Sequence, residues 1–150
     1  MTRILLNGAK GRYLECALVR QLKLTAKSLG EIRPVWMVLC PNSNLYIGKT
    51  LPPAGMFRSE GMNLCLGTDS LGSNEELSIL SEIKTLQRYY PGIPTGELFA
   101  WASRNGAQAL GINDRYGTFE TGKKPGVLLI TPADLKNRGL LQESRVQRLI

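Results

Sequence analysis

The sequence contains no histidine and only three cysteines among its 150 residues. Without histidine, a reactive carboxylate in this chain has no imidazole to act with it. Cys16, Cys40 and Cys65 are an odd number of thiols with no closely spaced pair, which argues against a disulfide framework and against a cysteine-based zinc site. Cys40 and Cys65 each lie in an apolar run, so we expect small buried thiols in a reducing compartment.

Long hydrophobic runs are also missing. No apolar stretch approaches the roughly 20 residues that cross a bilayer, and the first seven residues hold only three consecutive apolar ones. We therefore expect a cytoplasmic chain without a membrane partner. An apolar fraction of 43% and a charged fraction of 21% are ordinary for a soluble globular domain, and the length predicts a single one.

The net charge of +7 is unevenly placed. Residues 1–34 carry seven lysines and arginines against two glutamates, and the rest of the chain is nearly balanced. These basic residues are scattered rather than clustered, which favours a solvated basic face over a nucleic-acid site. Residues 4–6 are apolar enough for a short strand, but residues 1–34 otherwise stay unassigned.

From residue 35 onwards the signals for secondary structure are clearer. Residues 35–40 are apolar throughout, which predicts a strand covered on both faces, and residues 41–44 predict a turn that ends it. A short helix over residues 54–59 and a second apolar strand over 62–66 follow. A strand, a helix and a strand in this order predict a right-handed crossover between parallel strands.

Two longer helices are expected next. Ser73 and Glu76 have the spacing of a capping box, which predicts a helix over residues 74–88. A second helix over 95–105 breaks at Asn105-Gly106, and a short helical stub follows. The last part of the chain is rich in glycine and turns, with β-strands expected over 127–130 and 145–150. The fold class is therefore α/β with β structure appended.

One carboxylate is placed where chemistry is expected. The apolar run at residues 64–66 ends in Gly67-Thr68-Asp69, and parallel α/β folds keep reactive groups at the carboxyl ends of their strands. An alternative stays open, in which Asp69 is only a turn or helix-terminus carboxylate. The same holds for Ser43 and Asn44, which ordinary turn chemistry also explains.

Four motifs in a fixed order resemble a known family. They are Cys40-Pro41-Asn42-Ser43-Asn44-Leu45, Leu66-Gly67-Thr68-Asp69-Ser70 with Ser73-Asn74, the segment 105–111, and Tyr116-Gly117-Thr118-Phe119-Glu120-Thr121-Gly122-Lys123. Together they resemble the aminohydrolase branch of the amidohydrolase superfamily, the cytosine-deaminase-like and chlorohydrolase-like enzymes. The resemblance covers residues 35–131.

The resemblance implies a metal-dependent (β/α)8 barrel that hydrolyses carbon–nitrogen bonds other than peptide bonds, as in the deamination of a small heterocycle. Residues 35–115 would be the C-terminal part of the barrel, its last two strands and helices. Residues 116–150 would be a segment of a small β-domain. A complete barrel needs about 250 residues, so the resemblance covers only its last part, and a chain that supplies the missing half is a candidate partner.

The resemblance also implies a role for each site residue. Asp69 would bind a divalent metal, zinc or iron, and carry the proton of the attacking water, while Ser43, Asn44, Ser70 and Asn74 would bind a small-molecule substrate. The family holds its metal mainly with histidines, which this chain lacks. We therefore expect no tightly bound metal and no activity in the chain alone. The alternative is a non-enzymatic binding or scaffold module that reuses the half-barrel.

Overall fold

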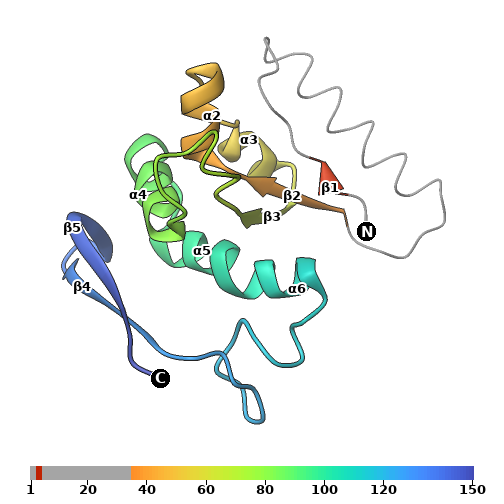
Figure 1. Cartoon of the computed structure of the whole chain (residues 1–150), viewed down its shortest axis with the longest axis vertical. Helices are drawn as coiled ribbons and strands as arrows, with labels where there is room; N and C mark the ends of the chain where they lie inside the picture. The colour runs from red at the N-terminus through yellow and green to blue at the C-terminus, as the bar shows by residue number, and fades with distance from the viewer. Residues whose placement is uncertain (1–2, 5–34) are drawn as a thin grey trace.

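The computed structural model describes residues 3–4 and 35–150, and within them the chain is α/β (Figure 1). The two longest helices of this described part are α2 and α4, and its strands form one parallel sheet and one antiparallel hairpin. The elements in chain order are β1 (Arg3–Ile4), β2 (Trp36–Leu39), α2 (Pro41–Gly48), α3 (Ala54–Ser59), β3 (Asn63–Leu66), α4 (Ile79–Tyr89), α5 (Thr95–Ala100), the π-helical turn η1 (Trp101–Asn105), α6 (Gly106–Leu110), β4 (Leu128–Asp134) and β5 (Gly139–Arg148).

The parallel sheet has the strand order β1-β2-β3. β2 and β3 pair in parallel from Trp36 opposite Asn63 to Leu39 opposite Leu66, with α3 in the connection between them. The expected crossover between parallel strands is thus confirmed. β1 pairs with the other edge of β2, which makes β2 the central strand, and it coincides only in part with the strand expected at residues 4–6. The remainder of residues 1–34 lies outside the described part of the chain.

The predicted turn at residues 41–44 is wrong, because α2 begins there at Pro41. Proline suits the first turn of a helix, where its missing N–H would have no helical partner and its φ is already helical. The N–H of Asn42 is one of the donors without a helical acceptor, and it is satisfied by the carboxylate of Glu82. Asn42, Ser43 and Asn44 therefore lie in the first turn of a helix, directly after the end of β2.

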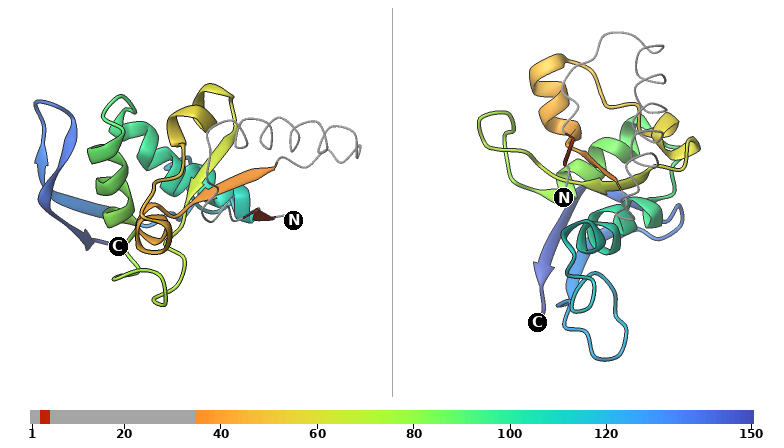
Figure 2. Two further views of the ribbon diagram at one scale, coloured as in Figure 1. Left: turned by 90° about the horizontal axis from the view of Figure 1, so that it is seen from above. Right: turned by 90° about the vertical axis from the view of Figure 1, so that its right-hand side faces the viewer.

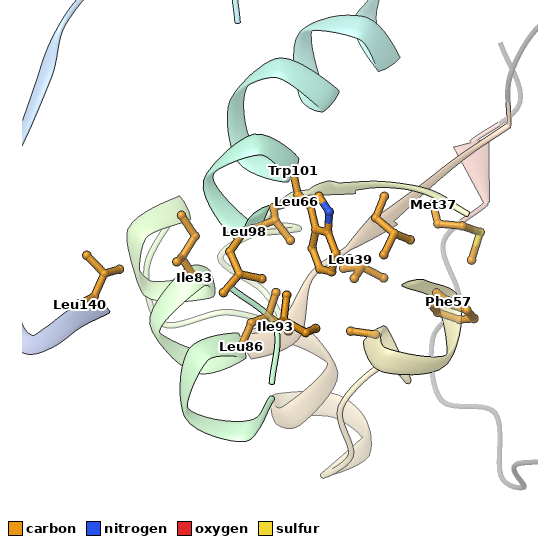
Figure 3. Close-up of a cluster of buried hydrophobic side chains, with 12 residues drawn as sticks. Met37, Leu39, Phe57, Leu66, Ile83, Leu86, Ile93, Leu98, Trp101 and Leu140 are labelled. Carbon is orange, nitrogen blue, oxygen red and sulfur yellow. The ribbon is translucent and has the colours of Figure 1, made fainter. Parts of the chain in front are cut away.

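The hydrophobic core lies between the sheet and the helices α3, α4 and α5. Figure 3 shows the Trp101 ring, which is 4% exposed, among Leu39 and Leu66 of the sheet and Leu98 of α5. Burying each such side chain contributes about 1.5–3 kcal/mol. The free thiols of Cys40 and Cys65 are buried as expected. Cys16 lies outside the described residues.

The start of α4 differs from the prediction. The helix begins at Ile79, and Ser78 is its N-cap, with the side chain accepting a hydrogen bond from the Ser81 N–H at 3.2 Å. The expected capping box of Ser73 and Glu76 is wrong, because tertiary contacts engage the Ser73 hydroxyl instead. The partners of this hydroxyl are Ser43, 30 residues before it, and Asp69, four residues before it.

The second helical region is longer than predicted. α5, η1 and α6 follow one another without a break from Thr95 to Leu110, and Gly111 ends them in a left-handed conformation. The expected break at Asn105-Gly106 is wrong. Asn105 instead turns its side-chain amide to the sheet and donates to the Leu64 carbonyl at 2.7 Å. This bond satisfies a carbonyl of β3 on the side away from β2.

The expected β structure after residue 116 is the hairpin β4–β5, which is longer than predicted and begins β5 at Gly139 rather than at residue 145. The hairpin lies beside α4 in both Figure 1 and Figure 2. Lys84 of α4 donates to the carbonyls of Gln142 and Ser144, each at 2.8 Å, and Gln87 exchanges two hydrogen bonds with the backbone of Leu140. No helix within residues 35–150 is long and apolar enough to cross a membrane.

Candidate functional site

Asp69 stands at the carboxyl edge of the parallel sheet, three residues after the end of β3. Its φ of 60° is left-handed, a conformation that aspartate and asparagine tolerate better than most residues do. Ser43 follows the end of the neighbouring strand β2. Because parallel strands end at the same edge of a sheet, the fold brings Asp69 and Ser43 together.

One oxygen of the Asp69 carboxylate is held by two serine hydroxyls. Oδ2 lies 3.0 Å from Ser43 Oγ and 3.0 Å from Ser73 Oγ, and the two hydroxyl oxygens lie 2.9 Å apart. Two hydroxyl hydrogens serve these three contacts and a fourth, from Ser73 Oγ to the Ser70 carbonyl at 3.3 Å, so at most two of the four are hydrogen bonds at one time. Both serines are buried, whereas Asp69 is exposed and no described residue donates to its other oxygen, Oδ1. The carboxylate is thus fixed through one oxygen and open at the other.

A second carboxylate, that of Glu82, lies buried behind this contact. The residue is 0% exposed; its Oε2 accepts from the backbone N–H of Asn42 at 2.8 Å, and its Oε1 accepts from Asn74 Nδ2 at 2.7 Å. Burial raises the pKa of Glu82, and the hydrogen bonds from Asn42 and Asn74 oppose that rise. Asn74 Nδ2 also donates to the Thr68 carbonyl at 2.8 Å, directly before Asp69.

The Cys40 thiol is not a nucleophile in this site. Burial raises its pKa to about 11, and the nearby carboxylates of Glu82 and Asp69 add to the rise. A thiol with so high a pKa stays protonated at neutral pH, and the thiolate is the reactive form.

The structure brings some of the predicted site residues together. Ser43 contacts Asp69, and Asn74 bonds to Glu82, both from buried positions. Ser70 is exposed beside Asp69, and Asn44 is half-buried on α2. Sequence reasoning missed Glu82, although a charged residue next to Ile83 on the inner face of an amphipathic helix is a detectable signal.

Sequence reasoning also misread Ser73, whose spacing to Glu76 suggested a helix cap. In the structure its buried hydroxyl contacts the Asp69 carboxylate. Its position four residues after Asp69, within the same loop, is the only indication of this role in the sequence.

The residues present do not by themselves fit a catalytic metal. Within residues 35–150, no group of three or more histidine, cysteine, aspartate or glutamate side chains is placed to hold an ion. Catalytic zinc sites use three protein ligands, and Asp69 offers one. Both oxygens of Glu82 are already bonded within the protein interior.

Comparison with known proteins supplies the family. The family model described as "Amidohydrolase family" matches residues 2–145, nearly the whole chain. The chain belongs to the amidohydrolase family. The relatives found are deaminases, in agreement with the resemblance of its motifs to the deaminase branch.

Two curated relatives illustrate the similarity. The 5-methylthioadenosine/S-adenosylhomocysteine deaminase of Moorella thermoacetica is 30% identical over 122 residues, which are 77% of this chain and 28% of the relative. The 5'-deoxyadenosine deaminase of Methanocaldococcus jannaschii is 36% identical over 97 residues, 60% of this chain and 23% of the relative. The chain thus spans about a quarter of the length of these relatives.

Two solved deaminase structures also resemble this chain in fold. An adenosine deaminase from Xanthomonas campestris with bound zinc matches with a TM-score of 0.61 and 29% identity, over 75% of this chain and 26% of that one. A 5-methylcytosine deaminase from Klebsiella pneumoniae, liganded with phosphonocytosine, matches with a TM-score of 0.58 over 87% of this chain and 34% of that one. The second is only 17% identical and supports the fold alone.

Proposed function

We propose that this chain forms the part of a deaminase-type amidohydrolase that supplies the aspartate of the active site. Residues 35–115 correspond in this proposal to the last two strands and helices of the (β/α)8 barrel, and residues 116–150 to a segment of a small β-domain. The observation that carries the proposal is the Asp69 carboxylate, fixed at Oδ2 by two buried hydroxyls and open at Oδ1. It stands at the sheet edge where barrels place their chemistry.

Asp69 acts in this proposal as the group that accepts a proton from the attacking water and returns it to the departing nitrogen. An oriented carboxylate of this kind contributes about 10²–10⁴-fold to a rate. Ser43 and Ser73 hold the carboxylate in place, and Asn74 fixes the loop that carries it. Ser70 and Asn44 are the remaining candidates for contacts with a substrate in this proposal.

The reaction class we propose is hydrolysis of a carbon–nitrogen bond in a small amino-substituted heterocycle. The names of the relatives make adenosine derivatives modified at the 5' position the first substrates to test. The family's divalent metal, zinc or iron, would need ligands from outside residues 35–150, because Asp69 is a single ligand there. By this proposal the chain is inactive alone and active only when another chain completes the barrel.

A non-enzymatic binding or scaffold module is the second candidate. The observation that favours it is the lack of histidine in the whole sequence, together with the single carboxylate at the sheet edge. The two candidates differ in what happens when the rest of a barrel is supplied.

The test is a complementation assay. The chain is assayed for ammonia release from 5'-deoxyadenosine, alone and mixed with the portion of a matched deaminase that this chain does not align with. We expect no turnover from either part alone and metal-dependent turnover from the mixture. A mixture that assembles on size exclusion but stays inactive would support the scaffold module, and turnover by the lone chain would contradict both candidates.

A further inference from the structure

Glu82 is a fully buried carboxylate without a basic partner. None of the ion pairs within residues 35–150 involves it, and its bonds go to amide groups on two separate segments. Burying a carboxylate is costly, and an uncharged side chain of similar shape would avoid that cost. The arrangement is therefore not explained by the stability of α4 alone.

The two amides that Glu82 binds stand next to the two serines that hold Asp69. Asn42, whose N–H bonds Oε2, directly precedes Ser43, and Asn74, whose side chain bonds Oε1, directly follows Ser73. Ser43 belongs to the start of α2 and Ser73 to the loop after β3. One carboxylate thus connects the two segments whose hydroxyls meet at Asp69 Oδ2.

Glu82 also fixes which way the Asn74 amide points. The Asn74 NH2 group donates one hydrogen to Glu82 Oε1 and the other to the Thr68 carbonyl. Both groups around that NH2 are pure acceptors, so only this orientation satisfies them. The Thr68 carbonyl directly precedes Asp69, so this bond holds the backbone next to the left-handed residue 69.

We propose that Glu82 is a positioning residue for Asp69: by binding Asn42 and Asn74 it holds the start of α2 and the loop after β3 in register, so that Ser43 and Ser73 meet the Asp69 carboxylate. Its effect on catalysis rests on the function proposed above. Its effect on the loop does not.

Glu82→Gln is the decisive variant because it keeps the shape and replaces one acceptor by a donor. The backbone N–H of Asn42 cannot turn round, so the oxygen of the substituted side chain must face it and the new NH2 must face Asn74. Asn74 then has to flip its oxygen toward that NH2, which removes the donor from the Thr68 carbonyl. Glu143→Gln, the same change at an exposed glutamate of β5, is the matched control.

The first measurement is amide hydrogen exchange in the full chain, followed residue by residue by NMR. The reporter is the Ser73 N–H, which bonds to the Ser70 carbonyl, and the reference is the Gly67 N–H, which bonds to Leu39 in the sheet. In Glu82→Gln we expect exchange at Ser73 to rise about tenfold with Gly67 unchanged, since the loop opens locally while the sheet stays folded. Ser73 exchange equal to that of Glu143→Gln would overturn the proposal.

The second measurement uses the complemented enzyme. A displaced Asp69 should lower kcat about 10²-fold in Glu82→Gln while KM stays within about twofold, because a small misplacement of a reacting group acts on the chemical step. An unchanged kcat would overturn the positioning role. If the wild-type mixture is inactive, the proposed function fails, and the exchange measurement still decides whether Glu82 holds the loop.

Asn74→Ala provides the second variant in case Glu82→Gln does not fold. It removes the link between Glu82 and Thr68 and leaves the bond from the Asn42 N–H intact. We expect the same local rise in Ser73 exchange. A wild-type exchange pattern in a folded Asn74→Ala would contradict the proposal.

Discussion

At the scale of single residues, the sequence pointed to Asp69 as a candidate but did not indicate what holds its carboxylate. An aspartate after an apolar run is visible in the sequence, because strand ends and their polar neighbours are local features. Ser43 contacts Asp69 across 26 residues of sequence, and the backbone N–H of Asn42 binds Glu82 across 40. No local spacing encodes such a contact, so turn and cap rules assigned these residues elsewhere.

The buried Cys40 gives a prediction on the pH dependence of stability. Its pKa is raised from 9.0 to about 11 by burial, so the folded chain keeps the proton to higher pH than the unfolded chain does. This contribution to stability is complete below pH 9 and is lost as the pH rises through 11. The loss is on the order of 2 kcal/mol.

Urea unfolding of the wild type and of Cys40→Ala at several pH values measures this contribution. We expect the stability of the wild type to fall more steeply than that of Cys40→Ala between pH 9 and pH 11. Below pH 9 the two curves should run parallel, offset by the lost packing of the thiol. Parallel curves over the whole range would show that the thiol is not buried as described.

At the scale of elements, the predicted unit of strand, helix and strand is confirmed as β2, α3 and β3, and its two strands are parallel as expected from their apolar runs. Element ends were predicted less well, because several residues could serve as caps and tertiary contacts chose among them. The Ser73 hydroxyl contacts the Asp69 carboxylate, and Ser78 is the residue that caps α4. The Asn105 side chain binds the Leu64 carbonyl of β3, and the helical region continues past it to Leu110, where Gly111 is the C-cap.

Gly117 gives a prediction at this scale. Its φ is 92°, and a Cβ added to it would lie 2.7 Å from the Cβ of Ala107 in α6. The close approach packs the segment after residue 116 against α6. We expect Gly117→Ala to lower the free energy of unfolding by about 2–4 kcal/mol, through backbone strain and overpacking together.

Gly122→Ala is the matched control, because Gly122 has nearly the same φ, 89°, and open space around it. It should cost about 1 kcal/mol, the strain of the left-handed backbone alone. Chemical denaturation of both variants measures the difference. Equal losses in the two would contradict the packing of Gly117 against α6.

At the scale of the whole molecule, the chain offers a parallel sheet and a two-stranded hairpin with several exposed apolar side chains, among them Leu128, Leu129 and Val146. Parallel sheets are usually covered on both faces and joined to further strands, and an isolated hairpin is marginal. The chain spans about a quarter of its deaminase relatives. These facts agree with a chain whose strands and site are completed from elsewhere.

The lack of histidine, visible in the sequence from the start, bears on the same point. The sequence could indicate that a metal site would be incomplete, because counting ligands needs no structure. It could not indicate that the Asp69 carboxylate is held by the buried hydroxyls of Ser43 and Ser73, because the contact with Ser43 depends on how β2 and β3 pair. The central claim is therefore that Asp69, in this setting, is the proton-carrying group of a site formed with another chain.

The most direct test compares Asp69→Asn with Asp114→Asn in the complemented enzyme. Asparagine tolerates the left-handed backbone of residue 69 and its oxygen can still accept from the serines, so folding and assembly should be unchanged. Asp114 is an exposed aspartate outside the site and controls for the change in charge. We predict that Asp69→Asn lowers ammonia release about 10³-fold while Asp114→Asn retains the wild-type rate. An assembled Asp69→Asn enzyme that keeps most of its rate would contradict the account.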